Sequence, residues 1–217
     1  MGLLDKIKDK VSGLSGGLLS QGLEQNNDVA ALLDQQSKAY ANVSTLNPLL
    51  NKHFKRLKIL EPELGKQNLD KWTNFVSMVE SDNNLKASNK ERVGADGSSA
   101  EGMYQFLTDN TNGQSSLQSA VNRTKKYVNE PWLDEVYKTG NIKDLTKDQQ
   151  TLLFHGDIFQ KTAQVNGKKV PGLGDNLMRG VLTGDKNSML EGYKILHHTN
   201  PDEATLKRMA KYEYLLD

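Results

Sequence analysis

A glutamate at the end of an apolar helical pattern is the first residue whose position suggests chemistry. Glu80 follows the stretch LDKWTNFVSMV, whose apolar residues recur at helical spacing, and precedes a loop rich in Gly, Ser and Asn. A carboxylic acid donates protons near neutral pH when burial raises its pKa, and the negative end of a helix acts in the same direction. We therefore expect Glu80 to be either a proton donor beside the core or, as is commoner at helix ends, a solvated polar group.

A second segment, SAEGMYQFL at residues 99–107, contains side chains suited to binding a sugar. Gln105 offers both a hydrogen-bond donor and an acceptor, which is what an acetamido group requires. Met103 and Tyr104 are expected in the wall of a pocket, although residues of these types also serve as core.

Together the two segments resemble the lytic transglycosylases of the goose-type lysozyme superfamily. The pattern of that family is Glu-Ser followed by Asn and small residues, a loop, and then Gly-x-x-Gln-Phe or Gly-x-x-Gln-Met. Here it reads Glu80-Ser81, and later Gly102 with Gln105 and Phe106. LTKDQQTLLFHGDIFQ and GYKILHHTNPDEAT look like segments of phage-borne members. The resemblance covers residues 67–210, but the loop before Gln105 is longer than usual and the family's Ala-Tyr-Asn motif is absent.

This resemblance implies a mainly α fold, a lysozyme-like α+β domain with a small loop or β region after the catalytic helix. It implies cleavage of the β-1,4 bond between N-acetylmuramic acid and N-acetylglucosamine, with no cofactor and no metal. Glu80 would protonate the bridging oxygen and then take the proton of the muramoyl 6-hydroxyl, which gives a 1,6-anhydro product. The implied substrate-binding residues are Ser81, Met103, Tyr104, Gln105, Tyr193 and His198, with Tyr193 as the tyrosine that orients Glu80 or the acetamide.

Two alternatives remain open from the sequence. A hydrolytic endolysin would need a second carboxylate as base or nucleophile, and Asp82, Asp96 and Glu101 are the candidates near Glu80. A structural ejection protein of a virion would keep the fold and lack the activity.

The adjacent histidines His197-His198 point about 100° apart on a helix, which does not suit a zinc-binding pair at i and i+4.

The composition narrows the partners and the setting. The formal net charge of +1, from 28 basic and 27 acidic residues, does not favour nucleic-acid binding. The absence of cysteine excludes disulfides and thiol nucleophiles. Charged residues interrupt the N-terminus before a signal-peptide core could form. The resemblance to phage-borne members then implies a virion protein that acts on peptidoglycan in the bacterial periplasm and cell envelope.

The 217 residues divide, in this interpretation, into an N-terminal helical extension at 1–66 and a transglycosylase domain at 67–217. An apolar stripe over residues 3–18 predicts an amphipathic helix that binds phage structural proteins or a membrane surface. Asn47-Pro48 predicts the start of a helix that Pro62 and Gly65 end. A further helix is expected from Leu69 to Glu80, then helices at 114–128, 131–138, 146–163, 186–196 and 201–215. A strand pair within 83–101 and a tight hairpin turn at 165–168 are also expected.

Overall fold

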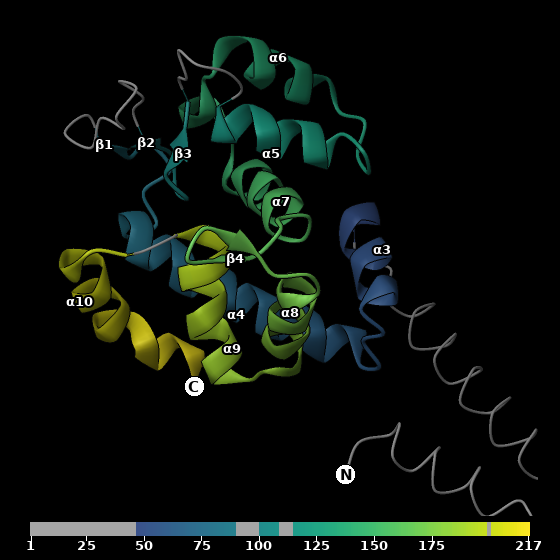
Figure 1. Ribbon diagram of the computed structural model, residues 1–217. Helices are drawn as coiled ribbons and strands as arrows, with labels where there is room; N and C mark the ends of the chain where they lie inside the picture. Colours follow the sequence, from purple (N-terminus) through teal and green to yellow (C-terminus); the bar gives the residue numbers. More distant parts are fainter. Residues whose placement is uncertain (1–46, 90–99, 109–114, 199–200) are drawn as a thin grey trace, which may run out of the picture. The chain divides into compact units, whose positions relative to one another are not determined.

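The computed structural model describes residues 47–89, 100–108, 115–198 and 201–217 (Figure 1). All of them belong to one compact unit that spans Thr45–Asp217. The predicted N-terminal amphipathic helix and the candidate base Asp96 lie outside the described residues. The described part is mostly helical, which confirms the mainly α prediction, whereas the lysozyme-like arrangement stays a prediction.

The helices and strands follow one another in a mixed order. The α-helices are α3 (Pro48–Arg56), α4 (Pro62–Ser81), α5 (Ser116–Thr124), α6 (Pro131–Thr139), α7 (Lys147–Ile158), α8 (Leu173–Thr183), α9 (Lys186–Gly192) and α10 (Glu203–Tyr212). Short helices are η2 (Ile142–Asp144), the π-helix η3 (Tyr193–His197) and η4 (Glu213–Leu216). The strands are β1 (Ser88–Asn89), β2 (Ala100–Glu101), β3 (Phe106–Leu107), β4 (Gln164–Val165) and β5 (Lys168–Lys169).

Several local signals in the sequence place the elements correctly. Asn47 caps α3 by accepting the backbone N–H of Leu50, and Pro48 is the first helical residue. Thr146 and Gln149 form a reciprocal capping box at the start of α7. The expected hairpin joins β4 and β5 through two residues that both have positive φ, as such a turn requires.

The sequence analysis is wrong about where two helices begin. Pro62 does not end a helix but is the first residue of α4, because its fixed φ suits the first helical turn and it needs no N–H there. The last long helix, α10, starts at Glu203 with Asp202 as its cap, so Pro201 precedes the helix. A helix that the pattern did not predict, α8, starts after Gly172, which offers no capping side chain.

Helix α4 is the element around which the unit is built. It contacts α8, α10 and η4, while α5 packs against α6 and α7 (Figure 1). One face of α4 is fully buried through Leu69, Trp72, Phe75 and Val76. Helix α3, part of the segment that we assigned to the N-terminal extension, also packs on this core. Arg179 of α8 donates to the carbonyl of Leu57, which follows α3, at 3.2 Å.

The strand pair expected within 83–101 is β1 with β2, and β3, which follows Gln105, adds a third strand to it. Their order is β1-β2-β3, and both pairings are antiparallel, with Ser88 opposite Glu101 and Glu101 opposite Phe106. This ribbon returns the chain from the end of α4 to the segment that contains Gln105. The two halves of the sequence motif are therefore joined by a sheet.

Candidate functional site

The carboxylate of Glu80 is buried near the C-terminal end of α4. Its side chain is 9% exposed, so the solvated alternative does not hold in this structure. The hydroxyl of Tyr193 donates a hydrogen bond to Oε1. Nε2 of His197 lies 3.4 Å from the same oxygen. Glu80 is thus held from one side by two residues of η3.

The π-helix explains how η3 can present several rings to one carboxylate. Its wider turn is closed by the backbone N–H of His198, which donates to the carbonyl of Tyr193 at 2.8 Å. Residues five apart therefore come close on one face, and the His198 ring stacks on Tyr193 with a centroid distance of 5.9 Å. Phe75 of α4 packs edge-on against Tyr193. The predicted residues Tyr193 and His198 thus lie together beside Glu80.

The pKa of Glu80 differs from the sequence-based expectation. Burial raises it, as expected, but the hydrogen bond and positive charge of His197 lower it, with smaller contributions from Tyr193 and His198. The net result is a pKa below the ordinary value of 4.5. The expectation of a raised pKa is wrong because the sequence analysis placed no cation beside the carboxyl. The charge of His197 acts only while its imidazole is protonated.

Ser81 ties the end of α4 to the segment that contains Gln105. Its hydroxyl donates to the carbonyl of Met103 at 2.9 Å. The turn at residues 102–105 begins with Gly102, whose φ is +76°, and its N–H donates to the carbonyl of Ala87. A Cβ at Gly102 would lie 2.8 Å from the side-chain oxygen of Gln150. Only glycine fits there, which gives the first residue of the Gly-x-x-Gln pattern a physical reason.

Gln150 fixes the same turn from α7. It is completely buried, and its oxygen accepts the N–H of Met103 at 2.8 Å. Its amide nitrogen donates to three backbone carbonyls, those of Leu85, Ile142 and Leu145. The segment LTKDQQ therefore combines a capping box with a side chain that holds the turn. The sequence points to this segment only by its resemblance to phage-borne members and predicts no role for Gln150.

The predicted sugar-binding residues of the turn differ in their exposure. Gln105 is half-buried, and its amide donates to the carbonyl of Gly102 at 2.9 Å. Its backbone has a φ of 50°, an unfavourable conformation for a residue other than glycine and one that recurs at binding sites. The side chain of Met103 has no exposed surface, so Met103 contributes to the site through its backbone. Tyr104 is nearly as buried, stacks on Phe154 and bonds Thr151.

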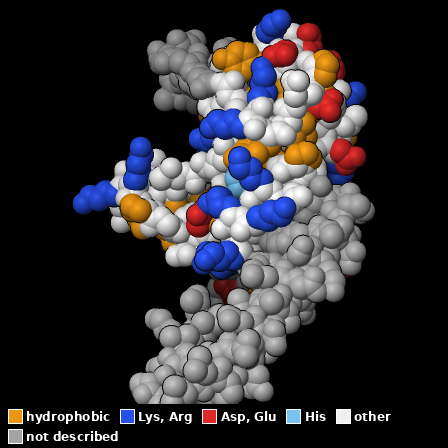
Figure 2. Space-filling view, turned by 90° about the vertical axis from the view of Figure 1, so that its right-hand side faces the viewer, with side chains coloured by type: hydrophobic (Ala, Val, Ile, Leu, Met, Phe, Trp, Pro, Cys, Tyr) orange, Lys and Arg blue, Asp and Glu red, His pale blue; other side chains and the backbone are white. Residues whose placement is uncertain are grey.

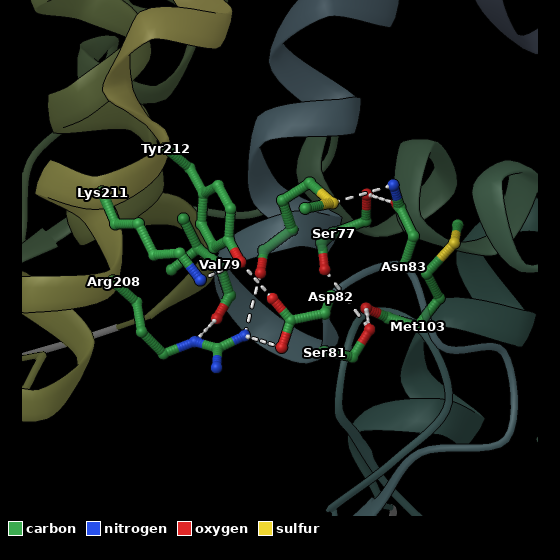
Figure 3. Close-up of polar contacts among 10 residues, drawn as sticks. Ser77, Val79, Ser81, Asp82, Asn83, Met103, Arg208, Lys211 and Tyr212 are labelled. Carbon is green, nitrogen blue, oxygen red and sulfur yellow. Dashed lines mark hydrogen bonds and ion pairs between the residues drawn. The ribbon is translucent and has the colours of Figure 1, made fainter.

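Helix α10 holds the C-terminal end of α4 in place (Figure 3). The Arg208 guanidinium donates to the carbonyl of Met78 at 2.9 Å, which also accepts the backbone N–H of Asp82, and to the carbonyl of Val79 in the last turn of the helix. It also pairs with Asp82 at 3.2 Å, and the Tyr212 hydroxyl donates to the same carboxylate. The bond from Tyr212, followed by the charge of Arg208, lowers the pKa of Asp82. Asp82 therefore joins the end of α4 to α10.

The other described candidate for a second carboxylate is also paired. Glu101 forms an ion pair with Lys143, with 3.1 Å between Oε1 and Nζ. The Ser88 hydroxyl lies 3.4 Å from the same oxygen. Each of the two described alternatives, Asp82 and Glu101, is therefore engaged by a cation. Glu80 differs from both, because the charges that act on it among the described residues come from the imidazoles of His197 and His198.

Two hollows occur elsewhere on the described surface. One, of about 410 Å³, lies between α4 and α7 and is lined by Thr73, Ser77, Tyr104 and Thr151. The other, of about 460 Å³, lies between α3 and the start of α8 and is lined by His53, Arg56 and Phe159. Neither is lined by Glu80. On the face seen in Figure 2, basic side chains are spread over the middle of the described surface, and most acidic side chains lie along its upper right edge.

Two further classes of site are not found in the part of the chain that the structure describes. It holds no group of three or more His, Cys, Asp or Glu residues arranged to bind a metal ion. None of its helices is both long enough and apolar enough to cross a membrane.

Sequence reasoning did not place His197 beside Glu80 and gave no role to Gln150 or Arg208, although all three shape this site. The spacing of Tyr193 and His197, four residues apart, was a usable signal for His197, since such residues share a helix face. Arg208 has no local signal, because its partners on α4 are about 130 residues away.

Comparison of the chain with protein families, with curated proteins and with solved structures finds no match in any of the three.

Proposed function

We propose that this protein is a peptidoglycan lytic transglycosylase in which Glu80 is the single acid and base. The observation that carries the proposal is the burial of Glu80 at the end of α4, with Tyr193 donating to its carboxylate. A carboxyl fixed in this way can give its proton to a glycosidic oxygen and then accept one from the attacking hydroxyl. The hydrogen bond from Tyr193 stabilises the carboxylate that exists between the two steps.

The position of the 102–105 turn supports a site for an N-acetyl sugar beside Glu80. Ser81, the neighbour of Glu80, binds the carbonyl of Met103, two residues before Gln105. The amide of Gln105 has one N–H bonded to Gly102, and its second N–H and its oxygen suit an acetamido group. These contacts bring the two halves of the family-like motif to one end of α4.

The pairing of Asp82 with Arg208 and of Glu101 with Lys143 supports a transglycosylase over a hydrolase. A hydrolase needs a second carboxylate that activates water or attacks the sugar. In a transglycosylase the 6-hydroxyl of the muramoyl residue attacks its own C1, so no second carboxylate is required. As the resemblance implies, we place the enzyme in a phage particle that delivers it to the cell envelope.

The substitution Glu80→Gln tests the proposal, because it keeps the shape of the side chain and removes its titratable proton. Purified sacculi incubated with the wild type should release 1,6-anhydromuropeptides, identified by mass spectrometry, and the variant should release none. Glu63→Gln is the matched control, since it makes the same chemical change at an exposed position of the same helix. It should leave the release unchanged.

The other outcomes distinguish the rival functions. Products with a free reducing end would identify a hydrolase. No product from the wild type would support a structural virion protein. Undiminished release of anhydromuropeptides by Glu80→Gln would show that another residue is the acid.

A further inference from the structure

The reaction that the resemblance implies gives His197 no role. Among the described residues, however, only Tyr193 comes closer than His197 to the carboxylate of Glu80. We propose that His197 shares the working proton of the site, so that the acid is the pair of Nε2 of His197 and Oε1 of Glu80 and not Glu80 alone. The catalytic part of this inference rests on the proposed function. The pairing itself exists in the free protein and needs no substrate.

The geometry around His197 supports a fixed pairing. The two side chains are 11% and 9% exposed, and Nε2 lies 3.4 Å from Oε1. The imidazole packs edge-on against Phe154 of α7, with ring centroids 5.3 Å apart and planes at 82°. Tyr193 donates to the same oxygen, Oε1. Among the described residues none bonds Oε2 of Glu80.

The charged groups around the pair come from several elements, but few act on Glu80. On η3, Tyr193 adds a hydrogen bond, and His198, the residue that follows η3, adds a positive charge. From α10, Arg208 is committed to Asp82 and to the carbonyls at the end of α4. From the 102–105 turn, the Tyr104 hydroxyl is bonded to Thr151, and α7 contributes the uncharged ring of Phe154. Of the described groups, His197 has the largest opposing effect to burial on the pKa of Glu80.

The proton can be followed through one turnover. When bound glycan excludes water, the proton leaves Nε2, the ring keeps the electron pair, and Glu80 becomes a neutral acid. Glu80 then protonates the bridging oxygen, the C1–O bond breaks, and its electrons stay with the leaving N-acetylglucosamine. The carboxylate next takes the proton of the 6-hydroxyl as O6 bonds to C1. That proton returns to His197, so the pair ends as it began.

The first test needs no substrate. Carbon-13 NMR of the Glu80 side-chain carboxyl, assigned with Glu80→Gln, gives its titration midpoint in the wild type and in His197→Gln. Loss of His197 should shift the midpoint upward, because burial raises the pKa of Glu80 and the hydrogen bond and charge that lower it most are then absent. Lys194→Gln removes a charge from the same π-helix and should leave the midpoint in place. An unchanged midpoint in His197→Gln would overturn the pairing.

The second test is the pH dependence of kcat/KM for sacculus cleavage, whose alkaline limb reports the essential acid of the free enzyme. An imidazole keeps its proton to higher pH than a carboxylic acid, so His197→Gln should move that limb to lower pH and reduce the rate at pH 7 by about tenfold or more. A purely structural histidine would lower the rate at all pH values and leave the limb in place.

The two tests separate failure of this inference from failure of the proposed function. An inactive wild type with a shifted Glu80 midpoint would remove the transglycosylase and keep the pairing. If the wild type is active and His197→Gln leaves the alkaline limb of the pH profile in place, the transglycosylase assignment would stand and the proposed role of His197 would be rejected. If circular dichroism shows that His197→Gln is unfolded, Phe154→Leu replaces it. This change loosens the orientation of the imidazole, so it should shift the midpoint upward by less.

Discussion

The hydroxyl of Tyr193 donates to the carboxylate of Glu80 across 113 residues of sequence. Tyr193 is fully buried and its ring packs against both Phe75 and His198, so the hydroxyl has little freedom to turn away. The bond brings a negative charge to a defined place at the end of α4. It therefore links the position of the site's acid to the π-helix, and with it to the C-terminal part of the chain.

Replacement of Tyr193 by Phe should lower the rate of anhydromuropeptide release by about 10- to 100-fold, because a hydrogen bond to a charged group contributes roughly 1.5 to 3 kcal/mol. The ring and its packing on Phe75 are kept, so the variant should stay folded, with a lower melting temperature because the buried carboxylate loses a hydrogen bond. A rate equal to that of the wild type would show that Tyr193 does not act on Glu80 during the reaction.

Gly102→Ala should destabilise the protein through two effects that a second glycine separates. Gly102 and Gly167 both have positive φ, 76° and 74°, which costs a residue with a Cβ about 1 to 2 kcal/mol. At Gly102 the new Cβ also meets Gln150 at 2.8 Å, whereas at Gly167 nothing lies within 4 Å. Urea denaturation should therefore show a larger loss for Gly102→Ala than for Gly167→Ala. Equal losses would mean that the turn moves freely away from α7.

Arg208→Met should lower the free energy of unfolding by about 1 to 3 kcal/mol, because two carbonyls at the end of α4 and the Asp82 carboxylate lose their charged partner. Lys207→Met is the control on the same helix. Its pair with Glu203 is largely exposed, and such pairs contribute roughly 0 to 1 kcal/mol. Thermal melting of both variants distinguishes the helix-end role of Arg208 from a general effect of charge, which would lower both melting temperatures alike.

His155 should make the protein sensitive to mild acid. Burial lowers its pKa from 6.5 to about 3, and its Nε2 lies 3.0 Å from the Thr73 hydroxyl. Below pH 6.5 the unfolded chain binds a proton that the folded chain does not, so the free energy of unfolding falls by roughly 1 kcal/mol per pH unit as the pH approaches about 3. His53 adds to this slope, because burial lowers its pKa to about 4.

Urea denaturation between pH 7 and pH 4.5 measures the acid sensitivity directly. His155→Gln keeps a group that bonds Thr73 and cannot gain a proton, so its stability should fall less steeply with acid than that of the wild type. Two parallel curves would show that His155 is protonated in the folded protein.

Local signals in the sequence determined those parts of the fold that neighbouring residues decide. The caps at Asn47 and Thr146 and the turn at 166–167 were predictable, because each depends on contacts within three or four residues. The start of α4 at Pro62 and the whole of α8 were not. Proline can end a helix or begin one, and the glycine before α8 gives no capping signal, so packing against the core decides both.

For the site, the sequence by itself determined that Glu80 follows a buried helix and that a Gly-x-x-Gln turn comes after it. Only the tertiary structure decided the ionisation of Glu80. Its pKa depends on His197 and Tyr193, which a π-helix more than 110 residues away presents to the carboxyl. The physical reason is that burial of a single residue can be read from apolar spacing, whereas the charges that face it come from elements whose positions long-range packing sets.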